Sequence, residues 1–308
     1  MRRKPSFLLG AALAAGATVL CQGLAGGVAS ASPYTEAQVA AGPQIQTSLL
    51  GKALSLDAVG LTTDGRLVRF DTLFPGFAST IGPVTGLTPD TTLVGIDYRV
   101  QDGRLYGVGN LGGIYVLSTT SAVATRVSQL TVPLVGTRFG VDFNPAANRL
   151  RIVSDLGENL RHNIDDPAGT PPPGVTVIDG PLTFPPSLTP AQGITGAAYT
   201  NNDLDPSTST TLFDIDTALD RVAIQSPANN GSLAPTGNLG VAAGPGAGFD
   251  IYSTLSGGRS VGSSAYAALS VGGRYALYSV ELLSGRVESV GRFPTGRQVF
   301  DLAFPLNQ

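Results

Sequence analysis

The chain has 308 residues, with 19 Lys or Arg against 22 Asp or Glu, and a formal net charge of −3. This length can bury a sizeable core, and the lack of a basic excess argues against nucleic-acid binding. Charged residues make up 13%, while 40 Gly and 22 Pro supply many turns. The apolar content is too high for a disordered chain. Short apolar runs between turn residues therefore favour an all-β fold.

The first residues follow the order of a secretory signal peptide. Arg2, Arg3 and Lys4 precede an apolar run, and small residues in an A-x-A pattern end at Ala31. The apolar run is short for a membrane span and is interrupted by polar residues. We expect residues 1–31 to be cleaved and the protein to be secreted, outside the cell or into the envelope, without stable membrane insertion.

Cleavage after Ala31 has two chemical consequences. It removes Cys21, the only cysteine, so the mature chain has no disulfide and no cysteine-based metal or redox chemistry. It also leaves 16 basic against 22 acidic residues. Two alternatives concern export: a lipid anchor on Cys21, which Leu20 before it disfavours, and twin-arginine rather than general secretion.

A strand pattern repeats along the chain about every 50 residues, which is the size of a four-stranded propeller blade. In each repeat an apolar strand is followed by turns and three further strand-like runs. Most of the first strands carry a glycine and, two residues later, an acid. These first strands are LVGIDYR (93–99), RFGVDFN (138–144), ITGAAYT (194–200), AGFDIYS (247–253) and QVFDLAF (298–304).

The two ends of the repeat array complete each other. Residues 58–87 hold three strands without a first strand, and residues 298–304 form a first strand with none after it. Joining them gives five blades and a ring without an open inner edge. We predict a five-bladed β-propeller as a single domain over 52–308, after a linker at 32–51. The alternative is a higher blade count, if residues 165–193 hide another pair of strands.

An acid recurs in the predicted inner strands. It is present in four of the five repeats, as Asp97, Asp142, Asp250 and Asp301, and Ala197 stands in its place in the third. We expect each aspartate to accept hydrogen bonds from backbone N–H groups of the adjacent loop. The alternative is a ring of carboxylates around the axis that holds a cation such as Ca²⁺.

The most charged stretch is RFGVDFNPAANRLRIVSDLGENLRHN (138–163). Charges at strand ends usually serve turns and bridge loops, and that interpretation is favoured here. The alternative is a rim of the ring that binds a ligand with carboxylate or hydroxyl groups. The candidate rim residues are Arg138, Asn144, Arg149, Arg151, Asp155 and Arg161.

The same stretch, with TTLFDIDTALDRVAIQSPANNGSLAPTGNLG (210–240), resembles a family of exported bacterial proteins known only as a domain of unknown function. The resemblance spans roughly residues 50 to 305. It implies a propeller-like β-fold, and it carries over no catalytic residue.

Three other features are weaker signals. His162 is the only histidine, so a mechanism that needs two is excluded. GRSVG (258–262) matches a nucleophile-elbow pattern, but no helix follows it and His162 precedes Ser260. TNNDLDPSTST (200–210) alternates oxygen-bearing residues without the EF-hand spacing, which favours a solvated loop over a calcium site.

These observations favour a secreted, monomeric binding module for a small molecule, a glycan or a protein. The alternative is a metal-assisted hydrolase or lyase, similar to sugar lactonases, with its site in the central funnel; that analogy rests on the fold alone. A purely structural envelope protein is a third hypothesis. The sequence indicates no catalytic residue and no cofactor, and Ca²⁺ is the one cation that the recurrent acids would suit.

Overall fold

The computed structural model describes residues 54–308. The predicted signal peptide (1–31) and linker (32–51) lie outside the described residues. The described chain consists of strands joined by turns, with two short 3₁₀ helices, η1 (Pro75–Phe77) and η2 (Ala228–Asn230). No helix in residues 54–308 is long and apolar enough to cross a membrane.

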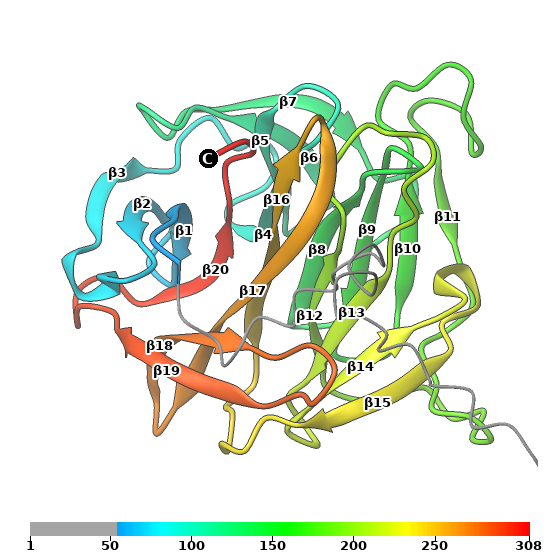
Figure 1. The fold of residues 1–308 in the computed structure, drawn as a ribbon. Coiled ribbons are helices and arrows are strands. Elements are labelled where there is room, and N and C mark those ends of the chain that lie inside the picture. The colour runs from blue at the N-terminus through cyan, green and yellow to red at the C-terminus, as the bar shows by residue number, and fades with distance from the viewer. Residues whose placement is uncertain (1–53) are drawn as a thin grey trace, which may run out of the picture. The chain divides into compact units, whose positions relative to one another are not determined.

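Twenty strands form five antiparallel sheets of four strands (Figure 1). The prediction of a five-bladed β-propeller is confirmed. Blade 1 contains β20 (Val299–Ala303), β1 (Asp57–Thr62), β2 (Arg66–Asp71) and β3 (Ser79–Pro83). Blade 2 contains β4 (Leu93–Arg99), β5 (Arg104–Gly109), β6 (Gly113–Leu117) and β7 (Ala124–Gln129).

Blade 3 contains β8 (Phe139–Asn144), β9 (Arg149–Ser154), β10 (Asn159–His162) and β11 (Thr176–Ile178). Blade 4 contains β12 (Ile194–Tyr199), β13 (Leu212–Asp216), β14 (Arg221–Gln225) and β15 (Leu233–Asn238). Blade 5 contains β16 (Ala247–Ser256), β17 (Arg259–Val271), β18 (Arg274–Val280) and β19 (Val287–Arg292). The segment 165–193 contributes only β11, so it adds no extra strand pair.

The inner strands are β20, β4, β8, β12 and β16, and each contacts the next in a closed cycle. The ring closes through blade 1, where β20 from the C-terminal end pairs antiparallel with β1. Val59 lies opposite Ala303 and Leu61 opposite Asp301. The composite blade expected from the orphan strands is therefore present.

Apolar side chains fill the spaces between blades rather than one central core. The five hydrophobic clusters each join two neighbouring blades. Between blades 2 and 3, for example, the rings of Tyr106 and Phe143 meet edge to face with their centroids 5.2 Å apart. Each blade is thus stabilised by both of its neighbours.

The recurrent glycines let the inner strands approach one another. A Cβ on Gly140 would lie 2.6 Å from the backbone nitrogen of Ala197, and a Cβ on Gly248 would lie 2.4 Å from the Cα of Asp301. Real Cβ contacts are never so short, so a side chain would push the neighbouring blade away. The glycine of the repeat therefore sets the width of the ring.

Deleting residues 298–308 should remove β20 from blade 1 and leave β1 as an open edge. We expect a large fall in the melting temperature measured by circular dichroism, because two blade interfaces lose their inner strand. Deletion of 305–308 alone is the matched control, since it retains β20. Melting of the two truncated proteins at the same temperature would contradict the closure described here.

Candidate functional site

The buried aspartates of the inner strands join each blade to the next. Each accepts a backbone N–H from the following inner strand. The bonds run from Phe143 to Asp97 (2.8 Å), from Tyr199 to Asp142 (3.2 Å), from Phe304 to Asp250 (2.7 Å) and from Ile96 to Asp301 (2.7 Å). Three of the four donors lie in the neighbouring inner strand, and Phe304 directly follows β20. The prediction that the donors belong to the loop adjacent to each aspartate is therefore wrong.

The interface between blades 4 and 5 lacks such an aspartate, and the residue in its place is Ala198, not Ala197 as expected. Ala198 packs in the cluster shared with blade 5, whereas Ala197 packs in the cluster shared with blade 3. Side chains of a strand alternate between its faces, and Ala198 follows Gly196 by two residues as Asp142 follows Gly140. Asn202 joins these blades instead, by donating from its side chain to the carbonyl of Ile251 (3.1 Å).

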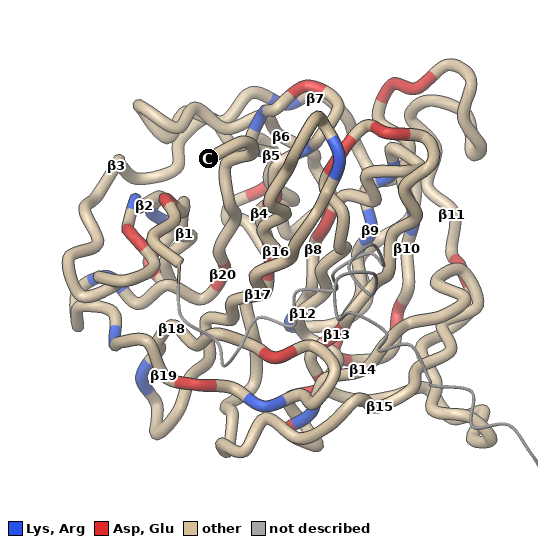
Figure 2. The backbone as a smooth tube through the Cα atoms, viewed as in Figure 1, with Lys and Arg blue, Asp and Glu red and all other residues tan. Residues whose placement is uncertain are grey.

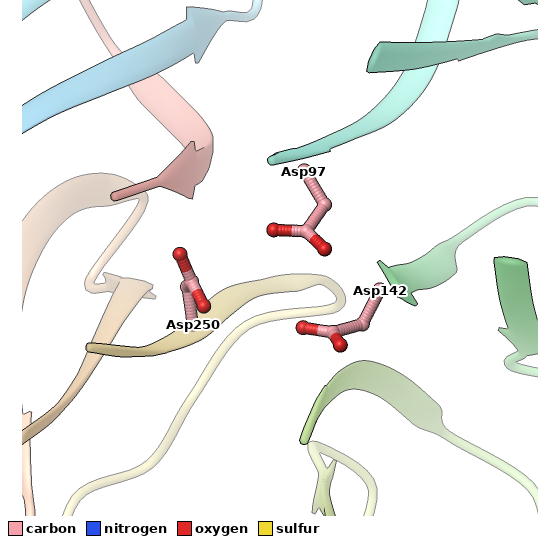
Figure 3. A group of neighbouring side chains, drawn as sticks. All are labelled: Asp97, Asp142 and Asp250. Atoms are coloured by element: carbon pink, nitrogen blue, oxygen red, sulfur yellow. The ribbon is translucent and has the colours of Figure 1, made fainter. Parts of the chain in front are cut away.

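Three of the four aspartates converge on the axis (Figure 3). Asp97, Asp142 and Asp250 each offer a carboxylate oxygen, and these oxygens lie within 4.8 Å of one another. Oxygen atoms so arranged can hold a divalent cation. Burial raises the pKa of Asp97 and Asp142 well above the usual value, and the negative charge of neighbouring aspartates raises both further. Without a cation, these groups therefore favour the protonated form.

Asp301 lies apart from this trio, nearer the start of the inner strands. Asp250 accepts the N–H of Phe304, which directly follows β20 and is three residues beyond Asp301, so the two acids are staggered along the axis. Figure 2 places acidic positions on β20, β4 and β8. The four candidate metal residues therefore do not form one ring: three converge, and the fourth lines a separate cavity.

A cavity of about 300 Å³ opens where the inner strands begin. We call it the mouth cavity. Its apolar wall includes Leu93, Phe139 and Phe300, and its polar lining includes Arg138, Tyr275, Asp301, Thr195 and Asn110. A second cavity of about 310 Å³ shares Arg138, Tyr275, Leu93 and Phe300 and reaches Thr63. The lining comes from all five blades, as is usual for a site on the axis of a propeller.

Arg138 extends across this mouth from blade 3 toward blade 5. A Cβ on Gly246 would lie 3.3 Å from the Cδ of Arg138 and 3.7 Å from the hydroxyl of Tyr275. No ion pair or side-chain hydrogen bond joins the Arg138 guanidinium to residues 54–308, and the side chain is exposed. Its charge is thus available to a ligand in the mouth cavity.

Asp155 holds the loop that carries Arg138. Its carboxylate accepts the backbone N–H of Thr137 (2.8 Å) and the Thr137 hydroxyl (2.6 Å). Its own backbone N–H donates to the carbonyl of Arg138 (3.0 Å). Of the six candidate rim residues, Arg138 and Asp155 therefore belong to the mouth, one as a lining group and the other as its anchor.

The other four candidate rim residues lie elsewhere in blade 3. Asn144 ends β8, away from the mouth, and caps the following turn through the N–H of Ala147 (2.8 Å). The remaining three are arginines bound to acids of the long segment that contains β11. Arg149 pairs with Asp166 (3.0 Å), whereas Arg151 (2.7 Å) and Arg161 (3.0 Å) both pair with Asp179. The structure does not bring these six residues onto one surface.

His162 is buried between blades 2 and 3, away from the mouth cavity. Its two ring nitrogens lie 2.8 Å from the hydroxyl of Ser128 and 2.9 Å from that of Thr176. Burial lowers its pKa to about 4. The imidazole is therefore neutral at physiological pH and joins two blades.

The two other weak motifs meet each other in one contact. Ser260 lies in the long strand β17, and its backbone N–H donates to Asp203 (2.8 Å). Arg259 pairs with Asp205, and the hydrogen bond from the Ser207 side chain is the largest effect that lowers the pKa of Asp205, to about 2. The acids of the loop 200–210 thus hold the β16–β17 hairpin.

Some site residues escaped the sequence analysis. Tyr275 and Gly246 border the mouth cavity, but nothing local distinguishes them from other turn and strand residues. Asp214 is fully buried in β13, and neither of its carboxylate oxygens has a hydrogen-bond partner among the described residues. Burial raises its pKa, and the charge of Arg151 opposes that rise. The sequence signal for Asp214 was its place inside the apolar run LFDID.

Comparison with protein families matches residues 66–303 to a domain of unknown function, DUF4394. The chain therefore belongs to this family, as its resemblance predicted. The comparison with curated proteins gives no match.

The chain is also similar to several solved structures. A protein of unknown function from Bacteroides thetaiotaomicron VPI-5482 is 13% identical, with a TM-score of 0.45, and the match covers 83% of this chain and 66% of that one. An auxiliary nutrient binding protein from Bacteroides ovatus ATCC 8483 is 12% identical, with a TM-score of 0.37 and coverage of 58% and 46%. Glutaminyl cyclase from Myxococcus xanthus is 13% identical, with a TM-score of 0.38 and coverage of 74% and 82%. Likenesses this low carry no argument about function.

The axial acids should make stability depend on pH. Burial raises the pKa of Asp250 from 3.8 to about 6. A carboxyl with a raised folded-state pKa contributes stability below its unfolded pKa and loses it as the pH rises through the folded value. Between pH of about 4 and about 7, the wild type should therefore lose on the order of 3 kcal/mol relative to Asp250→Asn.

Urea unfolding of both proteins across this pH range measures the difference. Asn keeps an acceptor for the N–H of Phe304 and does not titrate, and groups such as Asp205 are common to both proteins. Parallel pH profiles would show that Asp250 does not change its protonation on folding.

Proposed function

We propose that this protein is a secreted, monomeric binding module that takes a small polar ligand into the mouth cavity. The observation that carries the proposal is Arg138, a cation without a protein partner among residues 54–308, on a cavity of about 300 Å³. Asp155 and Thr137 fix its loop with three hydrogen bonds. A pre-positioned guanidinium is suited to a carboxylate or another planar anion, because it can donate two parallel hydrogen bonds.

The remaining lining fits a small molecule better than a large partner. Ligand sites combine apolar walls with a few placed polar groups, and Leu93, Phe139 and Phe300 supply such walls beside the Tyr275 hydroxyl and Thr195. The signal-like leader supports secretion, and the acidic balance of the chain supports a partner other than nucleic acid.

A panel of small carboxylates, including sugar acids, hydroxy acids and amino acids, should contain a compound that raises the melting temperature of the wild type. Arg138→Gln should abolish this increase, because the ligand loses its charged partner. Arg274→Gln is the matched control, since Arg274 precedes Tyr275 in β18 and bonds to Thr295 (3.1 Å). A panel without any Arg138-dependent increase would contradict the proposed function.

The second candidate function is a metal-assisted hydrolase or lyase. The observation in its favour is the convergence of Asp97, Asp142 and Asp250 within 4.8 Å. A divalent cation held there would polarise a substrate oxygen or activate a water molecule. The alternative role of these acids is to join adjacent blades by hydrogen bonds, which needs no metal.

Calcium separates the two roles of the trio. If the trio binds Ca²⁺, millimolar Ca²⁺ should raise the melting temperature of the wild type and EDTA should reverse the effect. Asp142→Asn should lose the increase, whereas Asp301→Asn, outside the trio, should retain it. Asp142→Asn should also cost about 1–3 kcal/mol without Ca²⁺, because a buried hydrogen bond is weakened. If divalent cations leave the melting temperature of the wild type unchanged, the metal-assisted function is wrong.

A further inference from the structure

The mouth cavity is lined by a cation and an acid that do not pair with each other. Arg138 and Asp301 both line it, and no ion pair between them exists in the described chain. The partners of the Asp301 carboxylate are backbone N–H groups, with Ile96 at 2.7 Å. The pKa of Tyr275 is raised mainly by burial, while Arg138 lowers it and Asp301 raises it, because both side chains lie near the same hydroxyl.

Both side chains lie beside the start of β16 in blade 5. The Cδ of Arg138 is 3.3 Å from where a Cβ on Gly246 would stand, and an oxygen of Asp301 is 2.9 Å from the equivalent position on Gly248. A cation from blade 3 and an acid from blade 1 therefore reach the same part of blade 5.

A zwitterion supplies the partner that each group lacks, a carboxylate for Arg138 and an ammonium group for Asp301. The cavity of about 300 Å³ is suited to a small molecule. Its apolar wall of Leu93, Phe139 and Phe300 would receive an apolar side chain.

We propose that the mouth cavity binds a free α-amino acid with an apolar side chain, its carboxylate on Arg138 and its ammonium group on Asp301. This inference rests on the proposed function, because it names the ligand class of the same cavity. Burial raises the pKa of the Asp301 carboxyl well above its usual value, and a ligand ammonium group beside it would favour the ionised form. Neither charge of the ligand is then left without a partner.

The first test uses the wild type, so it does not depend on how a variant folds. Isothermal titration calorimetry compares leucine with 4-methylpentanoate, which lacks the ammonium group, and with 3-methylbutylamine, which lacks the carboxylate. Leucine should bind, and each analogue should bind more weakly by more than about tenfold. Equal binding of 4-methylpentanoate, or no binding of leucine or other apolar amino acids, would overturn the assignment.

Variants then separate the two ends of the ligand. Arg138→Gln should weaken leucine and 4-methylpentanoate alike. Asp301→Asn, which keeps an acceptor for Ile96, should weaken leucine and leave the much weaker binding of 4-methylpentanoate unchanged. If the carboxylate panel shows Arg138-dependent binding but leucine is insensitive to Asp301→Asn, the zwitterion is wrong and the proposed function stands. If no carboxylate binds in an Arg138-dependent way, both are wrong.

Discussion

The hydrogen bond between a buried aspartate and the backbone of the next blade is the contact on which the ring depends. It occurs at four of the five blade interfaces, through Asp97, Asp142, Asp250 and Asp301. Carboxylates so deeply buried are tolerated because each receives at least one backbone N–H and because burial shifts their protonation. Close packing of the inner strands, which the glycines allow, brings donor and acceptor together.

The same bonds determine what the channel can do. The donors are offset along successive strands, so three carboxylates meet at one depth and Asp301 lies nearer the mouth. The mouth then holds one carboxyl group from blade 1 and one positive group from blade 3. The scaffold and the candidate site are therefore built from the same residues, and a substitution at Asp301 acts on both.

The strands, the blade count and the closure through β20 could be predicted because each depends on local patterns and on the repeat. The recurrent acids were equally visible. The partners of the arginines could not be predicted, because the sequence does not distinguish Arg138, Arg149, Arg151 and Arg161. Three of them pair with Asp166 or Asp179, which lie on a long segment without sequence periodicity. The offset of Asp301 depends on the stagger between strands, and Tyr275 reaches the mouth from blade 5. Both are properties of the assembled ring.

The most direct test of this account is a high-resolution crystal structure of protein purified from a secreting host without chelators and soaked with leucine. The account predicts density for the amino acid in the mouth cavity, with its carboxylate on Arg138 and its ammonium group on Asp301. An empty mouth cavity, or an Arg138 side chain turned away to pair with an acid of the protein, would contradict it.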